Sequence, residues 1–483
     1  MGGMWPRHTG PRPSETPMRI LPAVAPTREQ LRILADTKPG FVLIRGAAGS
    51  GKTTTALLRL RQLCDTRLLR HERLGLTSPV RVLVLTYNRT LEGYIAELAR
   101  QQVAGHRYLQ LEVRTFGKWA VDLLGGADIL DRDGTARLLR PYLAALPWAS
   151  AFTMEEVEYL LGRFEPAGLD AYLTAKREGR GTTPRVEQAL RRRLLDEVVA
   201  PYTEAKKRDG VLDWNDISVA ARDVTDVPPW DVVIVDEAQD FSANQVRAVL
   251  AHLADSFSVT FVMDAMQRIY PRYFTWAEAG VDRFANVYTL KENHRNTRQI
   301  AAFARPIIEG LAVEDDGALP DLDACTKEGT LPVVVAGKYS SQIDFILARL
   351  LATVDFGSDS VVFLQPRAGK WFSYLRGRLR VAGLPWTELT RASVWPTGPE
   401  AIALSTVHSA KGLEFDHVVI PGLNAQVTPH GGGDGDAQYD ALRRLIAMGV
   451  ARARKSVIVG FKPDDPSAVL SLLKPNTFEL VTL

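Results

Sequence analysis

The sequence predicts an α/β protein built on parallel sheets, with an all-helical insertion in its first half. Three observations indicate this fold. The apolar runs 41–44 and 231–235 have the length of buried parallel strands, and each leads directly into residues typical of a ligand-binding loop. Further strand-like runs occur at 331–335, 360–364 and 418–420. Between residues 127 and 210, in contrast, Leu, Ala and Arg recur with helical spacing.

The composition fits an ordinary globular protein of two or more domains. Of its 483 residues, 46% are hydrophobic and 24% are charged, and the formal net charge is +3. So small an excess of positive charge does not by itself indicate a nucleic-acid partner. The two cysteines, Cys64 and Cys325, show no metal-binding spacing. No apolar run reaches the ~20 residues that span a bilayer. We expect a cytoplasmic protein without membrane contact, with residues 1–26 as a flexible leader.

The first apolar run leads into a glycine-rich loop and then a helix. In such a loop, backbone N–H groups surround nucleotide phosphates, a lysine reaches the β and γ oxygens, and the next hydroxyl binds Mg²⁺. Lys52 and Thr53 stand at these two positions. A chance glycine-rich turn is the alternative, and the flanking strand and helix argue against it. The predicted loop comprises Gly46, Ala47, Ala48, Gly49, Ser50, Gly51, Lys52, Thr53 and Thr54.

The second apolar run ends at two acidic residues, Asp236 and Glu237. Ligands of open α/β sheets bind at the carboxyl ends of the strands. Asp236 is therefore placed to hold Mg²⁺, and Glu237 to polarise the water that attacks the γ-phosphate. A solvated acidic turn is the alternative, but the uninterrupted strand before the pair argues against it. Together, the two motifs predict hydrolysis of a nucleoside triphosphate.

An ordered series of motifs resembles the UvrD/Rep type of superfamily 1 helicase. The order of the motifs, more than any one of them, makes the resemblance specific. It implies two RecA-like P-loop domains. The first comprises residues 27–126 and 211–290, interrupted by the helical insertion 127–210, and the second comprises residues 291–483. The motif segments are 27–30, 46–55, 83–89, 115–117, 235–240, 261–270, 290–296, 405–416 and 449–455.

The resemblance also implies particular nucleotide contacts. Gln30 would read the adenine and Glu414 would contact the ribose. His294 stands where the family usually has a tyrosine that stacks on the base, and an imidazole stacks less extensively. The cofactors implied are ATP and Mg²⁺.

Cations from the second domain complete the expected catalytic set. Arg295 and Arg452 resemble the family's two arginine fingers, and fixed cations stabilise the charge that spreads over the γ oxygens during hydrolysis. A surface arginine in a solvated basic run is the alternative for Arg452. Gln267 resembles the γ-phosphate sensor. With Lys52 and Glu237, these residues form the predicted catalytic set.

Contacts to single-stranded DNA are a further implication of the resemblance. Aromatic rings in such a groove stack on bases of any sequence. For Tyr270 and Trp276, core packing under a loop is the alternative, and for the basic helices of the insertion a solvated face is the alternative to DNA binding. The predicted contacts are Thr86, Tyr87, Asn88, Thr115, Phe116, Tyr270, Trp276, Thr406 and His408.

The function expected from these features is an ATP-dependent translocase or helicase on single-stranded or partly duplex DNA, moving 3′ to 5′ by family resemblance. The large helical subdomain that the family inserts between the equivalents of Arg295 and Thr406 has no room here, so we expect a compact form that depends on a protein partner. The alternative is a DNA-stimulated ATPase that senses or loads DNA for a separate effector, such as a nuclease. An NTPase unrelated to nucleic acid would leave the motifs at 86–88 and 406–408 without a role.

Overall fold

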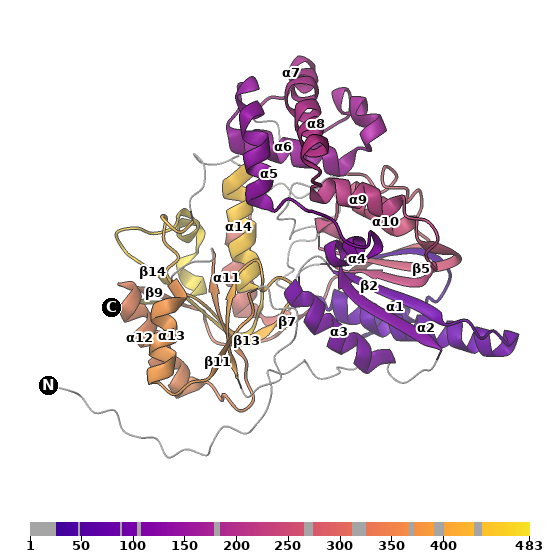
Figure 1. Ribbon diagram of the computed structural model, residues 1–483. Helices are drawn as coiled ribbons and strands as arrows, with labels where there is room; N and C mark the ends of the chain where they lie inside the picture. The colour runs from indigo at the N-terminus through magenta and orange to yellow at the C-terminus, as the bar shows by residue number, and fades with distance from the viewer. Residues whose placement is uncertain are drawn as a thin grey trace.

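Two parallel sheets, each flanked by helices, form the body of the molecule, and a helical bundle stands on the first (Figure 1). The structure is a computed structural model, which describes residues 26–46, 49–86, 89–103, 108–177, 184–264, 274–311, 325–366, 371–390, 400–428 and 437–483. This architecture confirms the predicted α/β class with two parallel sheets. No helix within these ranges is both long and apolar enough to cross a bilayer.

The first sheet has the order β3-β2-β4-β5-β1-β6, and all its neighbouring strands are parallel. Valine and isoleucine in β4 and its neighbours are completely buried, as expected for strands covered on both faces. The strands are β1 (Gly40–Gly46), β2 (Val80–Thr86), β3 (Leu109–Thr115), β4 (Trp230–Val235), β5 (Leu253–Met263) and β6 (Asn286–Leu290). The flanking helices are α1 (Arg28–Leu34), α2 (Lys52–Leu74), α3 (Arg89–Val103), α4 (Phe116–Leu123), α9 (Trp214–Arg222) and α10 (Ala243–Leu250).

The turn between β1 and α2 depends on glycine. Gly51, the residue that precedes α2, has φ 76°, a conformation that side chains with a Cβ rarely adopt. The helix therefore starts at Lys52, with its first N–H groups directed at the loop. Leu57 and Leu60 on one face of α2 are buried in the main apolar cluster, which fixes this helix on the sheet.

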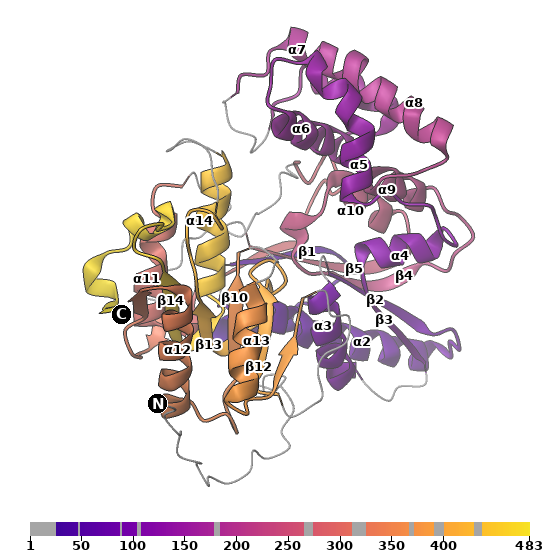
Figure 2. The same cartoon turned by 60° about the vertical axis from the view of Figure 1, so that its left-hand side comes forward.

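The described residues between 127 and 210 fold mainly as helices with an apolar core of their own (Figure 2). A bridge between Ile129 and Leu212 closes the base of this insertion. Its elements are α5 (Arg132–Leu139), a 3-10 helix (Arg140–Ala145), α6 (Ser150–Arg163), a second 3-10 helix (Pro166–Leu173), α7 (Gln188–Arg193), a π-helical turn (Leu194–Val199) and α8 (Ala200–Asp209).

Several basic residues of the insertion have partners inside the protein. Arg177 forms two 2.8 Å hydrogen bonds to the fully buried carboxylate of Glu156. Lys206 is buried and lies 2.7 Å from Asp213. These two cations stabilise the fold of the insertion and its junction with α9, so their side chains are not available for DNA binding.

The second sheet has the order β11-β12-β10-β13-β14-β9-β15 and is also parallel throughout. Its strands are β9 (Val333–Ala336), β10 (Val361–Gln365), β11 (Trp386–Glu388), β12 (Ile402–Thr406), β13 (Phe415–Ile420), β14 (Ala453–Phe461) and β15 (Glu479–Thr482). A separate pair is formed by β7 (Asn293–Thr297) and β8 (Cys325–Lys327). The helices are α11 (Arg298–Ile308), α12 (Tyr339–Thr353), α13 (Trp371–Val381) and α14 (Ala437–Val450), with 3-10 turns at Ala468–Leu472 and Pro475–Thr477.

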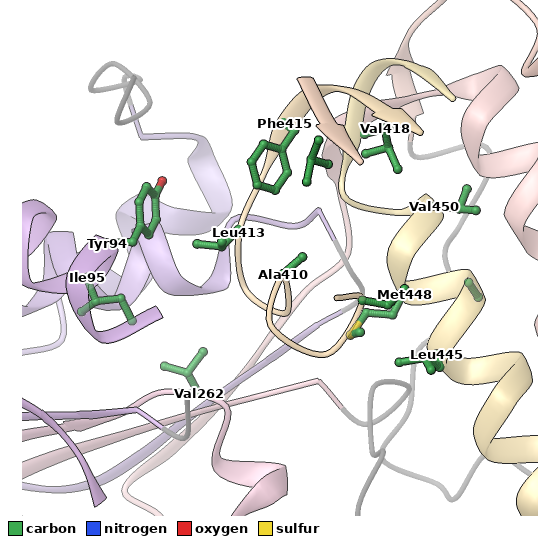
Figure 3. Packing of buried hydrophobic residues seen from close by; sticks show 14 of the residues in the cluster. Tyr94, Ile95, Val262, Ala410, Leu413, Phe415, Val418, Leu445, Met448 and Val450 are labelled. Carbon is green, nitrogen blue, oxygen red and sulfur yellow. The ribbon is translucent and has the colours of Figure 1, made fainter. Parts of the chain in front are cut away.

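The two α/β domains meet along an apolar seam (Figure 3). Tyr94 and Ile95 of α3 belong to the same cluster of buried side chains as Ala410 and Leu413, which follow β12. The seam places the loops that follow β1, β4 and β5 opposite the segments that precede β13 and β14. Residues of both domains therefore line the space beside these loops.

Candidate active site

A cleft at the seam is lined by charged and polar residues from both domains. The first domain supplies the glycine-rich loop, and it also supplies acidic residues that follow β4 and β5. The second supplies residues that follow β12 and residues that precede β13 and β14. The described residues that line the cleft are Gly49, Gly51, Lys52, Thr53, Thr54, Tyr94, Leu98, Glu237, Asp264, Arg295, Gly412, Glu414 and Arg452.

Lys52 lies at the floor of the cleft, at the first turn of α2. Its ammonium donates a 2.8 Å hydrogen bond to the Gly46 carbonyl and lies 3.1 Å from an Asp264 carboxylate oxygen. Gly49 and Gly51 both have positive φ, 85° and 76°. Their conformation lets the loop backbone approach a bound anion closely, with the lysine held beside it. Ala47 and Ala48 lie outside the described residues.

Thr53 and Asp236 form the part of the site that suits a magnesium ion. The Thr53 hydroxyl donates to the Asp236 carboxylate, with oxygen separations of 3.1 and 3.2 Å. Burial, reinforced by the neighbouring charge of Glu237, raises the pKa of Asp236 to about 7. A divalent cation would relieve this repulsion, and one carboxylate with one hydroxyl leaves positions for water and phosphate oxygens. When bound, the ion would neutralise charge on the β- and γ-phosphates.

Glu237 has an unusual backbone and a strongly polar environment. Its φ of 54° lies in the left-handed region, which is rare for a residue with a long side chain and is often found at functional sites. Gln239 donates a hydrogen bond to its carboxylate, and the Lys411 ammonium lies 3.5 Å from it. Burial opposes ionisation, but the charges of Lys411 and Arg452, with that of Lys52, hold the pKa of Glu237 below its usual value. The carboxylate is therefore ionised at neutral pH, as a base requires.

Arg452 and Arg295 bring positive charge to the opposite wall. Arg452 is only 2% exposed and donates to the carbonyls of Met448 and Leu413. This burial excludes the solvated surface position that the sequence left open for it. Burial, with the nearby charge of Arg295, lowers the pKa of Arg452 to about 10, which leaves the guanidinium charged at neutral pH.

Arg295 forms an ion pair with Glu414 and donates to the Ala451 carbonyl at 3.3 Å. Burial opposes ionisation of Glu414, but Arg295 keeps the pKa of its carboxyl below the usual range. The Arg295 Nε is buried and has no acceptor among the described residues. An orphaned guanidinium donor in the wall of the cleft fits an anionic ligand such as a triphosphate.

Some of the residues predicted to contact the nucleotide lie outside the part of the chain that the structure describes. Gln30 is 7% exposed, and its side-chain oxygen accepts from the Thr27 backbone N–H in a capping box at the start of α1. The other end of this amide faces the loop, because a Cβ on Gly51 would lie 2.9 Å from its nitrogen. His294 lies on β7, but its side chain is outside the described residues, and so is the whole of Gln267.

Few of the predicted DNA contacts are exposed. Thr86, Thr115 and Thr406 end strands β2, β3 and β12, and all three are buried. Phe116 is 2% exposed and packs between Trp119 and Phe241, with ring centroids 5.6 and 5.8 Å away. The carboxyl ends of β2, β3 and β12, which carry the three threonines, lie at one edge of each sheet. Tyr87, Asn88 and Tyr270 lie outside the described residues.

Trp276 and His408 differ in their surroundings. Trp276 packs against Phe261, Phe274 and Phe284, which corresponds to the core-packing alternative; its contact with DNA stays a prediction. His408 is exposed on the turn after β12. Partial desolvation, with the positive charges of Lys411 and Arg132, lowers its pKa, so the imidazole is neutral at physiological pH.

The sequence assigned no role to three residues that line or support the cleft. Asp264 directly follows the buried strand β5, as Asp236 follows β4, and this parallel could have identified it. Lys411 lies between Glu237 and the fully buried Asp240, to which it donates a hydrogen bond. Tyr94 lines the cleft from α3. Nothing in the local sequence of Lys411 or Tyr94 indicates which surface of the other domain they meet.

The fold and the cleft together define a protein with two α/β domains and a glycine-rich loop of the phosphate-binding type at their junction. Two family models match the chain: an AAA domain at residues 30–272, about half of the chain, and a UvrD-like helicase C-terminal domain at residues 385–462. The chain belongs to the UvrD-like superfamily 1 helicases, a family of DNA helicases that hydrolyse ATP. Membership implies use of a nucleotide, usually with Mg²⁺, and binding of DNA.

A similar solved structure is the C-terminal domain of a possible DNA helicase from Lactobacillus plantarum WCFS1. It is 21% identical, covers 39% of this chain and 98% of its own, and superposes with a TM-score of 0.29. So low a TM-score supports no functional inference. None of the curated proteins matches the chain.

Proposed function

We propose that this protein is a motor that hydrolyses ATP to move along single-stranded DNA, 3′ to 5′, and separates the duplex ahead of it. The observation that carries the proposal is the shared cleft: Lys52 and Glu237 come from one domain, and Arg295 and Arg452 from the other. A nucleotide in contact with both walls favours a closed arrangement of the domains, and its cleavage removes the contacts that hold them together.

In this mechanism, the chain's own groups have separate roles. Lys52 and the loop N–H groups orient the triphosphate, while the ionised Glu237 takes a proton from the attacking water. Arg295 and Arg452 stabilise negative charge as it develops on the γ oxygens. Thr53 and Asp236 would hold the magnesium ion. The turn of residues 406–411 runs from the predicted DNA contacts Thr406 and His408 to Lys411 beside Glu237, which provides a direct physical connection between the two sites.

A strand-displacement assay on 3′-tailed and 5′-tailed duplexes tests this function. We expect ATP-dependent displacement of the 3′-tailed duplex, none of the 5′-tailed one, and ATP turnover that rises at least ~10-fold when single strands are added. The Glu237→Gln variant is the matched negative control. Preference for the 5′-tailed duplex would contradict the polarity, and turnover indifferent to DNA would contradict the motor.

A second candidate is a DNA-stimulated ATPase that loads or senses DNA for a separate effector. The observation in its favour is the short connection between β11 and β12, which is limited to residues 389–401. By resemblance, the family inserts a large helical subdomain between the equivalents of Arg295 and Thr406, and the described residues of that stretch outside this connection form strands and helices of the second domain itself. DNA-stimulated turnover without displacement of either tailed duplex would support this candidate over the first.

A further inference from the structure

A buried side-chain amide, that of Asn296, connects the segments that carry Arg295 and Arg452. Asn296, the residue after Arg295, is 3% exposed. Its Nδ2 donates to the Ala451 carbonyl at 3.1 Å and to the Ala453 carbonyl at 2.6 Å. These carbonyls immediately flank Arg452. Because both acceptors are carbonyls, the amide nitrogen must face them, which fixes the orientation of the side chain.

A second amide completes the connection on the other side. The Asn293 oxygen accepts the backbone N–H groups of Arg295 and Asn296, both at 3.1 Å, and its nitrogen donates to the Asn296 oxygen at 3.1 Å. Asn293 also touches the glycine-rich loop, since a Cβ added to Gly49 would lie 2.4 Å from the Asn293 oxygen. Hydrogen bonds therefore run from Asn293, which lies against the phosphate loop, to the backbone of Arg295 and, through Asn296, to the backbone on both sides of Arg452.

These hydrogen bonds can hold Arg295 and Arg452 in place although their charges repel each other. Two buried guanidinium groups repel each other, and the repulsion contributes to the lowered pKa of Arg452. Arg295 forms a direct ion pair with Glu414, while Glu237, Asp264 and Glu414 together offset part of the repulsion at Arg452. Neutral hydrogen bonds to the backbone on both sides of Arg452 can fix its position without adding charge to the cleft.

We propose that Asn296 is a positioning residue that fixes Arg452 relative to Arg295, and that Asn293 transmits the position of the phosphate loop to this pair. The inference rests on the proposed roles of the two arginines in ATP hydrolysis. Asn296 itself does not line the cleft, so it acts on turnover through Arg452. Geometry of this kind has large kinetic consequences, because a displacement of 1 Å can lower a rate by about 100-fold.

The test is the Asn296→Ala variant of the full chain, measured by steady-state ATP hydrolysis with saturating single strands. We expect kcat to fall about 10-fold to 100-fold. The KM for ATP should change less than threefold, because the phosphate loop is intact. In an Arg452→Ala background the same substitution should change kcat by less than about twofold, since the residue it positions is gone.

Asn244→Ala is the matched control. Asn244 is 2% exposed, and its Nδ2 likewise donates to two backbone carbonyls, those of Leu161 and Phe164. It joins α10 to the insertion, away from the described residues that line the cleft. We expect a similar loss of thermal stability and a kcat within about twofold of the parent chain. If Asn296→Ala does not fold, Asn296→Ser, which leaves a smaller void, carries the same expectation.

The outcomes separate this inference from the proposed function. A full loss in Arg452→Ala with normal kcat in Asn296→Ala would overturn the positioning role and leave the function standing. Independent, multiplicative losses in the double variant would also overturn it. Normal kcat in Arg452→Ala would overturn both. Loss in both single variants, without further loss in the double variant, would support the inference.

Discussion

The two α/β domains share one architecture but present opposite edges of their sheets to the cleft. In the first domain, the functional groups follow the carboxyl ends of β1, β4 and β5, and its acidic residues, Glu237 and Asp264, line the cleft. In the second, Glu414 and Arg452 immediately precede the amino ends of β13 and β14. In the proposed mechanism, the first domain supplies the phosphate loop and the second supplies the cations on the far side. The proposal therefore predicts that hydrolysis requires both domains.

The largest effect is expected when a cation of the second domain is removed from the cleft. Arg452→Ala should lower kcat by about 1000-fold, the magnitude typical of an arginine finger, because the γ oxygens lose a buried cation. ATP affinity, measured by equilibrium titration, should change less than 10-fold. Equal losses in affinity and turnover would instead indicate that Arg452 only binds the nucleotide.

The corresponding change in the first domain is Glu237→Gln. Removal of a general base costs about 100-fold to 10,000-fold in kcat. Because the amide keeps the shape of the side chain, the variant should still bind ATP, and rapid-quench measurements should show uncleaved nucleotide on the enzyme. Turnover close to that of the parent chain would exclude Glu237 as the base.

Lys411 tests the contact between the domains. It is buried between Glu237 and Asp240. Because Lys411→Ala removes a buried cation that lies beside both carboxylates, the free energy of unfolding should fall by about 3–5 kcal/mol in urea titrations. Lys455→Ala is the control: the Lys455 side chain is half exposed in its ion pair with Asp359, so loss of the pair should cost less than about 1 kcal/mol. Equal small losses would show that the Lys411 contact contributes little.

How much of this site the sequence could predict also differs between the domains. The strand, glycine loop and acidic pair identified Lys52, Thr53 and Asp236, because ligands of parallel sheets bind at carboxyl ends. No such rule points to residues that precede a strand, so Arg452 and Glu414 depended on the family resemblance. One hydrogen-bond partner of Arg452, the Leu413 carbonyl, lies 39 residues away in the sequence, and a local sequence pattern does not indicate such a contact.

The predicted DNA contacts show a second limit of the sequence. Thr86 and Thr115 could be assigned to strand ends, since the apolar runs that precede them are clear. The burial of these two threonines could not be predicted, because it depends on which helices cover the strand ends. Phe116 and Trp276 illustrate the ambiguity of aromatic residues: the same ring suits a base stack or a core, and here both rings pack on other aromatic side chains.

The smallest expected effect concerns the repulsion between the carboxylates of Asp236 and Glu237 in the absence of a metal ion. The pKa of Asp236 is raised to about 7, above its value in the unfolded chain, so the folded state binds an extra proton between about pH 4 and pH 7. In EDTA, the native protein should therefore lose stability as the pH rises through this range. Asp236→Asn should raise Tm by a few degrees at pH 8 and by less at pH 5. A variant that melts lower than the parent chain at pH 8 would contradict the repulsion.

The central claim is that one triphosphate is held between the two domains. A crystal structure of the chain with ADP, Mg²⁺ and aluminium fluoride, which mimics the transferring phosphoryl group, tests it most directly. We predict guanidinium nitrogens of Arg295 and Arg452 within hydrogen-bond distance of the fluoride ligands, with the Lys52 ammonium on the side of the first domain. A mimic bound to the glycine-rich loop alone, with both arginines out of reach, would contradict the account.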